Sequence, residues 1–169
     1  MSDVTERAGF AFFWNGWPSQ WHPAVFTVDG VRYSCAEQFM MAEKARLFGD
    51  EETRVAILAA ASPRDHKALG RKVRSFDSAR WADACREVVY RGNIAKFSQN
   101  ADLRELLLAT GDRTLAEASP YDKIWGIGLT ADDPNATDRT AWSGRNWLGE
   151  VLMRVRAELR DVARAEQRP

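Results

Sequence analysis

The sequence predicts a mainly helical fold, on the border of α+β, folded as a single compact multihelical domain with one small β-hairpin. At least five segments carry helix signals, whereas only one short stretch, "AVFTVDGVRY" at 24–33, alternates around a two-residue Asp29-Gly30 turn. The chain has 169 residues, of which 45% are hydrophobic, and this is enough for one core. We therefore expect one domain over 1–169, with its core at about 10–160.

The helices are expected where caps and apolar periodicity coincide. Ser34 is predicted to cap a helix that Gly49 ends, and Ser34-x-x-Glu37 has the pattern of a capping box. Ser62 followed by Pro63 predicts the start of a second helix. Further helices are expected at 79–100, 103–109 and 145–164, the first of them as a central helix, and a long exposed loop at 130–143, a length that more often indicates function.

Charge and cysteine content exclude several classes of protein. Basic and acidic residues both number 24, so no global field attracts nucleic acid or a membrane. No stretch approaches ~18 uninterrupted apolar residues, and the first residues do not have the pattern of a leader, so we expect a cytosolic protein. Cys35 and Cys85 lack metal-ligand spacing and are predicted to be buried reduced thiols. His22 and His66 are isolated, and no metal is predicted.

The helix at 34–48 places two charged residues on its apolar side. When the helix is wound at 100° per residue, Glu37 and Lys44 fall on one arc with Met40, Met41, Leu47 and Phe48. The two charged residues are two turns, roughly 10 Å, apart along the axis. Capping by Glu37 and snorkelling by Lys44 are the structural explanation. The chemical explanation is a desolvated lysine that acts as a nucleophile beside a proton-exchanging glutamate.

Two further stretches are candidates for ligand binding. Arg71 follows Gly70 in a basic helix face, which makes it a candidate for phosphate, although most such faces are merely solvated. The "WGIG" stretch from Trp125 to Gly128 lacks the strand and helix context of a dinucleotide site. Trp125 beside flexible backbone suits stacking on a base, with core packing as the alternative.

Taken together, these stretches resemble the NADAR, or YbiA-like, family over nearly the whole chain. The resemblance lies in "FFWNGWP", "VDGVRYSCAEQFMMAEKARLF", "ASPRDHKALGR", the tryptophan at 81, "KFSQNADLRELLLATG", "LAEASPYDKIWGIG" and "GRNWLGEVLMRVR". It implies a single YbiA-like domain and an N-glycosidase, a hydrolase of N-glycosyl compounds. Some members hydrolyse phosphoribosylamino-pyrimidine intermediates of riboflavin synthesis, and others remove ADP-ribose from guanine. Many members have histidine where this chain has Gln38, and the loop at 130–143 is longer than in compact members.

The resemblance also implies roles for particular residues. Lys44 is expected to form a Schiff base with the ribose carbon, and Glu37 to act as acid and base. The expected substrate-binding residues are Arg71, Trp81, Asp122, Trp125, Gly126, Gly128 and Asn146. No cofactor is expected.

The partner implied by the resemblance is a small phosphoribosyl or ADP-ribosyl compound, with no membrane involved. One alternative is an ADP-ribosylated guanine in DNA or in a nucleotide, with the base flipped out if it lies in DNA. Another is a non-catalytic ADP-ribose-binding module, which needs Trp125 and Arg71 but no neutral Lys44.

Overall fold

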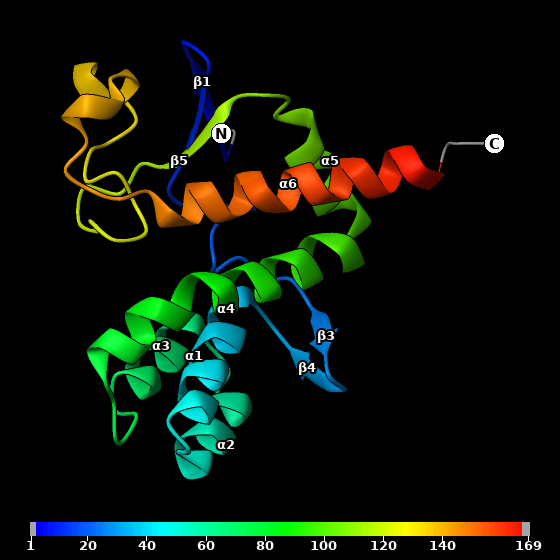
Figure 1. Cartoon of the computed structure of the whole chain (residues 1–169), viewed down its shortest axis with the longest axis vertical. Coiled ribbons are helices and arrows are strands. Elements are labelled where there is room, and N and C mark those ends of the chain that lie inside the picture. The colour runs from blue at the N-terminus through cyan, green and yellow to red at the C-terminus, as the bar shows by residue number, and fades with distance from the viewer. Residues whose placement is uncertain (1–2, 167–169) are drawn as a thin grey trace. The chain divides into compact units, whose positions relative to one another are not determined.

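The computed structural model describes residues 3–166 and divides them into two units (Figure 1). One unit is the segment 20–100, and the other combines the segment before it with the segment after it. Six α-helices account for most of the regular secondary structure of residues 3–166, and the strands form two small sheets. The predicted mainly helical fold is therefore confirmed, whereas the single domain over 1–169 stays a prediction, and its end residues 1–2 and 167–169 lie outside the described part.

The unit 20–100 begins with the predicted hairpin. Strands β3 (Phe26–Val28) and β4 (Val31–Tyr33) pair antiparallel. Between them Asp29 has a φ of 49° and Gly30 a φ of 77°. Two consecutive residues with positive φ form the turn whose twist matches that of paired strands, which is why an Asp-Gly pair specifies it.

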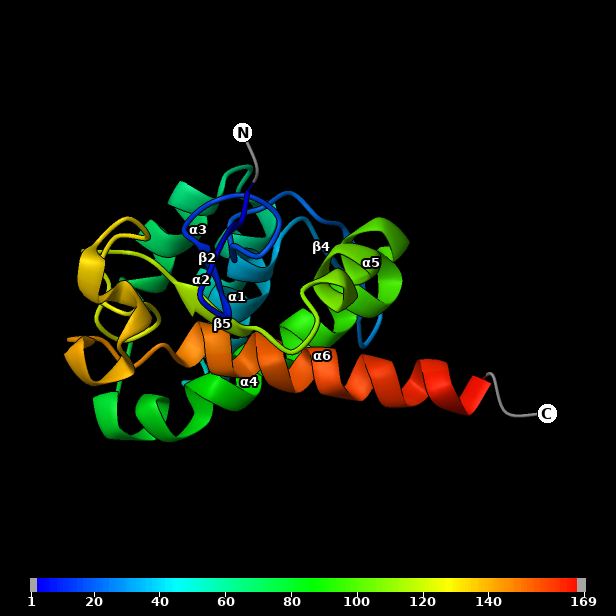
Figure 2. The same ribbon diagram turned by 90° about the horizontal axis from the view of Figure 1, so that it is seen from above.

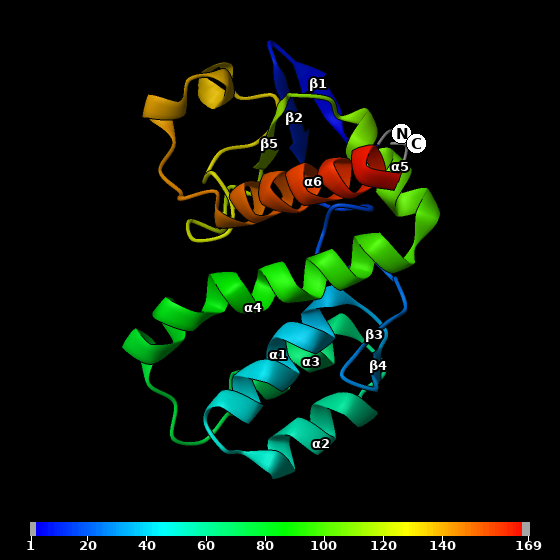
Figure 3. The same cartoon turned by 45° about the vertical axis from the view of Figure 1, so that its right-hand side comes forward.

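Four helices complete this unit. They are α1 (Ala36–Leu47), α2 (Glu51–Ala59), α3 (Pro63–Gly70) and α4 (Ser78–Gln99). Helix α1 packs against the other three, and Figure 3 shows α4 beside α1. The central helix of the unit is therefore α1, whereas the sequence predicted a central helix at 79–100. Helix α2 was not predicted.

The ends of α1 differ in how well the sequence predicts them. At the C-terminus, Gly49 has a φ of 71° and donates to the carbonyl of Arg46, and Asp50 donates to the carbonyl of Ala45. This is a Schellman motif, as the glycine indicates. At the N-terminus, the predicted capping box with Ser34 is wrong, because the cap residue is Cys35 and its side chain makes no capping bond.

The second unit contains a sheet that the sequence did not predict. Strand β2 (Phe10–Phe13) pairs antiparallel with β1 (Thr5–Arg7) and parallel with β5 (Thr114–Glu117). Its two helices are α5 (Ala101–Ala109) and α6 (Trp147–Glu166), and α6 runs beside β5 (Figure 2). The parallel pairing joins segments about a hundred residues apart, so no local pattern announces it.

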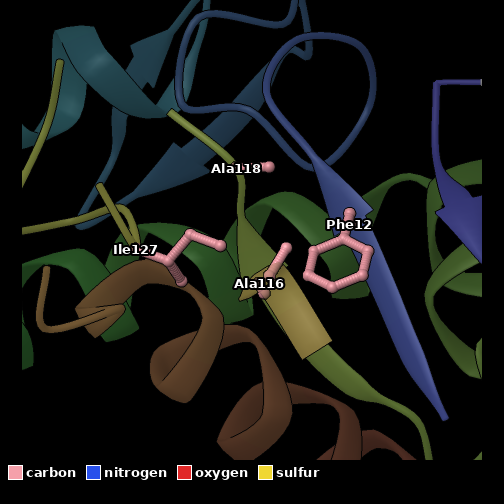
Figure 4. Close-up of a cluster of buried hydrophobic side chains, with 5 residues drawn as sticks. Phe12, Ala116, Ala118 and Ile127 are labelled. Carbon is pink, nitrogen blue, oxygen red and sulfur yellow. The ribbon is translucent and has the colours of Figure 1, made fainter. Parts of the chain in front are cut away.

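The core of this second unit lies on β2 and β5. Phe12, Ala116, Ala118 and Ile127 converge there in Figure 4, together with buried Ala136. Ala136 lies in a short 3-10 helix, Pro134–Thr137, which is followed by a second one, Arg139–Ala141. The indole of Trp142 donates to the Ala136 carbonyl. The predicted long exposed loop at 130–143 is therefore confirmed in part: most of its residues are exposed, but two short 3-10 helices interrupt it and Ala136 packs into the core.

No helix within residues 3–166 combines the length and the apolar character that crossing a bilayer requires.

Candidate functional site

Nine of the first ten residues of helix α1 are buried, and the exception is Lys44. The residues from Ala36 to Ala45 are all buried except Lys44, which is half-buried. The prediction of a single apolar arc on this helix is therefore wrong, since α1 is enclosed on more than one side. Because the flanking residues are fixed by packing, the start of the Lys44 side chain is held in place, and the residue as a whole stays half-buried.

The Lys44 amine lies against a backbone carbonyl and two aromatic rings of the unit 20–100. Its Nζ donates to the carbonyl oxygen of Gly70 at 2.8 Å. The ring centroid of Phe76 lies 4.3 Å from Nζ, and that of Trp81 lies 5.8 Å away. One carbonyl and two aromatic rings therefore replace much of the water around the amine.

These surroundings lower the pKa of Lys44 below its ordinary value. The largest cause is loss of hydration through burial, and the positive charge of Arg71 acts in the same direction. The negative charge of Glu37 acts against both and raises the pKa. The net result is an amine that loses its proton more readily than a solvated lysine, which is what a nucleophilic amine requires.

Glu37 is buried in the first turn of α1 and interacts electrostatically with Lys44. Its backbone N–H donates to the carbonyl of Gln20. The capping role falls instead to Gln38, whose Oε1 accepts from the N–H and the hydroxyl of Ser34 at 2.7 and 3.0 Å. Capping of α1 therefore does not explain why a glutamate is buried at position 37.

The glycine before Arg71 serves helix packing. Gly70 is buried, and a Cβ at this position would overlap the side chain of Met41 on α1. The absence of a side chain allows the last turn of α3 to approach α1, so that the Gly70 carbonyl reaches Lys44. The expectation that Gly70 admits an anion is replaced by this packing role, while Arg71 itself is exposed.

Of the residues predicted from the sequence, Glu37, Lys44, Arg71 and Trp81 come together in the unit 20–100. Phe76 belongs to the same cluster and was not predicted. It lies in the irregular segment 71–77 between α3 and α4, where no periodicity marks an aromatic residue as functional. Its one signal is composition: Phe76 is a bulky apolar residue within the otherwise polar stretch "RSFDSAR".

A second competing amine, Lys96 on α4, is fully buried. Burial lowers the pKa of Lys96 to about 7. Without exposed surface, however, its amine is closed to a substrate, so Lys44 is the better candidate nucleophile.

The other predicted residues lie in the second unit. The carboxylate of Asp122 accepts from the backbone N–H groups of Ile124 and Trp125, both at 2.8 Å, and so fixes the start of the "WGIG" turn. A Cβ on Gly126 would lie within 3 Å of backbone oxygens of Asp122 and Glu117. Gly128 has a φ of 76°. Gly126 therefore allows backbone segments to pack closely, and Gly128 allows a backbone angle that other residues rarely adopt.

Trp125 is half-buried and packs edge-on against Trp147, with ring centroids 5.9 Å apart. Asn146 is buried with a φ of 54°. Its side chain accepts from the N–H of Glu117 and donates to the carbonyl of Leu115. Asn146 thus joins the start of α6 to β5, and contacts of Trp125 and Asn146 with a substrate stay predictions.

The unit 20–100 thus brings together a half-buried amine with a lowered pKa, a buried glutamate and an exposed guanidinium on one helical scaffold. The chain belongs to the NADAR domain family, whose pattern matches residues 12–160. The suspected family is therefore confirmed.

Individual relatives agree with this membership. The chain is 46% identical to N-glycosidase R617 of Acanthamoeba polyphaga mimivirus, over 83% of this chain and 85% of the relative. It is 33% identical to N-glycosidase YbiA of Shigella boydii, over 78% and 74% of the two chains. It is 32% identical to riboflavin biosynthesis protein VVA0006 of Vibrio vulnificus over 88% of this chain, but over only 37% of that longer protein.

A solved structure has the same fold. The NMR structure of the E. coli protein YbiA superposes with a TM-score of 0.77 at 28% identity, covering 99% of this chain and 94% of the other.

Proposed function

We propose that this chain is an N-glycosidase that cleaves the bond between ribose C1 and a nitrogenous base or amine, with Lys44 as nucleophile and Glu37 as acid and base. The enzyme class, a hydrolase of N-glycosyl compounds, is the one named for its mimiviral and bacterial relatives. The observation that carries the proposal is the Lys44 amine, which is half-buried between Gly70, Phe76 and Trp81 and interacts with the Glu37 carboxylate.

The first half of the reaction forms a covalent intermediate. The Lys44 ammonium first gives one proton to the Glu37 carboxylate. The neutral amine then bonds to C1 while the C1–N bond to the base breaks, and Glu37 gives this proton to the departing nitrogen. A proton then passes from Nζ to the ring oxygen, the C1–O bond of the ring breaks, and a protonated imine joins C1 to Nζ. The Gly70 carbonyl, already an acceptor for Nζ, is placed to accept the N–H of this cation.

The second half of the reaction hydrolyses the imine and regenerates the free enzyme. Water adds to C1 of the imine, and the Glu37 carboxylate takes its proton. Glu37 then protonates Nζ and takes up the proton that the new hydroxyl loses, so that C1 becomes an aldehyde and Lys44 leaves as a neutral amine. Glu37 ends protonated, as it was when the amine attacked C1, and the balance is one water consumed for each bond cleaved.

We infer the substrate class from Arg71 and Trp125. The exposed guanidinium of Arg71 suits a phosphate of a phosphoribosyl or ADP-ribosyl group. The half-buried indole of Trp125 suits stacking on a base. A relative named for riboflavin biosynthesis supports a phosphoribosyl intermediate of that route, and a cytosolic site of action fits the buried free thiols of Cys35 and Cys85.

Two alternatives make different predictions. Hydrolysis of ADP-ribosylated guanine, in DNA or in a nucleotide, keeps the same chemistry but needs a larger binding surface for the base. A non-catalytic ADP-ribose-binding module needs Arg71 and Trp125 but is indifferent to Lys44→Arg.

The decisive experiment incubates the protein with a phosphoribosylamino-pyrimidine and, separately, with ADP-ribosylated guanosine, and separates the products by mass spectrometry. We expect release of the free amine or base with one of them. Lys44→Arg keeps the charge but cannot form an imine at neutral pH, so it should be nearly inactive. Lys72→Arg, at an exposed lysine, is the matched control and should keep full activity.

Binding variants test the substrate contacts. Arg71→Ala should weaken substrate binding by roughly 1.5–3 kcal/mol, as expected for a charge-assisted hydrogen bond. Trp125→Ala should lose about 1–3 kcal/mol of binding if the indole stacks on a base. A Trp125→Ala protein that melts early but binds normally when folded would assign the indole to packing instead.

A further inference from the structure

Asp50 lies where three elements of the unit 20–100 meet. It directly follows Gly49 after the end of α1 and is the N-cap of α2, where its carboxylate accepts from the N–H and hydroxyl of Thr53 at 3.2 and 2.7 Å. The same carboxylate accepts from the backbone N–H and guanidinium of Arg74 at 2.9 and 2.6 Å. The Asp50 side chain is only 1% exposed, whereas that of Arg74 is 63% exposed.

The Arg74 contacts fix the segment 71–77, which links α3 to α4. The segment contains no helix or strand, and Ser75 within it has a φ of 55°, a conformation that side chains other than glycine rarely adopt. A backbone hydrogen bond and an ion pair to one buried carboxylate therefore hold a segment that has no regular secondary structure of its own.

Phe76 lies two residues after Arg74. Its ring packs edge-on against Phe48, the residue that ends α1, with centroids 5.3 Å apart, and its face lies 4.3 Å from the Lys44 amine. Phe76 as a whole residue is nevertheless 46% exposed, so packing on its outer side does not hold the ring in place. Its place over Lys44 depends on the segment that carries it.

Resting on the proposed role of Lys44, we infer that Asp50 is a positioning residue for this reaction: through Arg74 it holds the segment 71–77 so that Phe76 covers the Lys44 amine. Phe76 then limits the water around Lys44 and forms one wall of the space in which C1 of the sugar meets Nζ. Asp50 does this without touching the amine or the substrate.

The Phe76 ring affects the Lys44 amine in two opposing ways. It excludes water, which favours the neutral amine, and its electron-rich face attracts the charged form. We expect exclusion of water to be the larger effect, because burial is the leading cause of the lowered pKa of Lys44 and the Phe76 ring is one of the groups that cover the amine. The charged groups that act on this amine in the described chain, Glu37 and Arg71, both keep their charge in the Asp50 and Phe76 variants, and Arg71 is held on α3 by its backbone N–H, which donates to the Lys67 carbonyl. Displacing the ring should therefore raise the pKa of Lys44.

The test measures the titration of Lys44 directly and needs no substrate. The free protein is labelled with a trace of acetic anhydride over a series of pH values, and mass spectrometry gives the acetylation of Lys44 relative to the exposed Lys123. Only the neutral amine reacts, so below the midpoint each unit of pKa increase lowers the neutral fraction about tenfold. The midpoint is compared among the wild type, Asp50→Ala, Phe76→Ala and the double variant.

Thr53→Val is the matched control, because it removes a hydrogen bond to Asp50 on the α2 side and leaves the Arg74 side intact. We expect the Lys44 midpoint to rise in Asp50→Ala and in Phe76→Ala. The double variant should rise no further than Phe76→Ala, and Thr53→Val should match the wild type. If Asp50→Ala does not fold, Arg74→Ala replaces it, since this variant removes the ion pair and keeps the N-cap.

Three results would overturn the inference: a folded Asp50→Ala protein with an unchanged midpoint, a double variant whose shift is the sum of the two single shifts, or a Thr53→Val midpoint that rises with Asp50→Ala. Failure of the proposed function has a different signature. In that case Lys44→Arg keeps its glycosidase activity, whatever the labelling shows.

Discussion

Replacing Gln38 with alanine should destabilise the protein while sparing its chemistry. The Gln38 side chain accepts two hydrogen bonds from Ser34, at 2.7 and 3.0 Å, and donates to the carbonyls of Ile57 and Leu58, at 3.1 and 3.2 Å. It therefore caps α1 and ties that helix to the end of α2. Each such bond contributes about 0.5–1.5 kcal/mol, and a buried group left without a partner costs more.

The expected loss of stability in Gln38→Ala is smaller than the sum of four hydrogen bonds. The Ile57 carbonyl also accepts from the N–H of Ala60, and the Leu58 carbonyl is partly exposed, so both keep other partners. We expect Gln38→Ala to lower the free energy of unfolding by about 2–4 kcal/mol. Urea denaturation followed by circular dichroism measures this, with Glu37→Gln as the adjacent control that should unfold near the wild-type midpoint but hydrolyse slowly.

The opposite pattern would refute this account of α1. A Gln38→Ala protein as stable as the wild type would show that its four bonds contribute nothing net. A stable but inactive Gln38→Ala protein would place Gln38 in the chemistry.

Three further variants test the structure elsewhere. Asn146→Ala should cost about 2–3 kcal/mol, because two hydrogen bonds to β5 are lost and a non-glycine residue without a polar side chain must keep a φ of 54°; an unchanged urea midpoint would contradict this. Gly30→Ala should cost about 1–2 kcal/mol at its φ of 77°, and a melting temperature equal to that of the wild type would disprove it. Arg71→Gln removes a charge that lowers the pKa of Lys44, so the acid limb of the pH–rate profile should move to higher pH; a limb that stays in place would separate Arg71 from the nucleophile.

The sequence predicted the elements whose signals are local. The hairpin followed from Asp29-Gly30, the start of α3 from Ser62, and the end of α1 from Gly49, because each of these residues acts on backbone within a few positions. Strand β2 was missed because "FAFF" is buried along nearly its whole length and shows no alternation. Its parallel partner β5 is about a hundred residues away.

The residues of the candidate site also differ in whether a local sequence signal marks them. Lys44 and Glu37 were predicted because a charge on an otherwise apolar helix stands out. Phe76 and Asp50 were missed because their importance arises from contacts between segments: Phe76 reaches Lys44 from the segment after α3, and Asp50 holds that segment through Arg74. Helix α2 was missed although Asp50, Glu51 and Glu52 have the pattern of a capped helix start, since only Ile57 of the helix is buried.

The measurement that tests the central claim most directly is reductive trapping on the intact enzyme. Borohydride added during turnover reduces a protonated imine to a stable secondary amine, and peptide mapping by mass spectrometry then locates it. We predict a ribose-derived adduct on Lys44, absent from Lys44→Arg and from samples without substrate. An adduct on Lys67 or on the buried Lys96, or a fully active Lys44→Arg enzyme, would contradict the account.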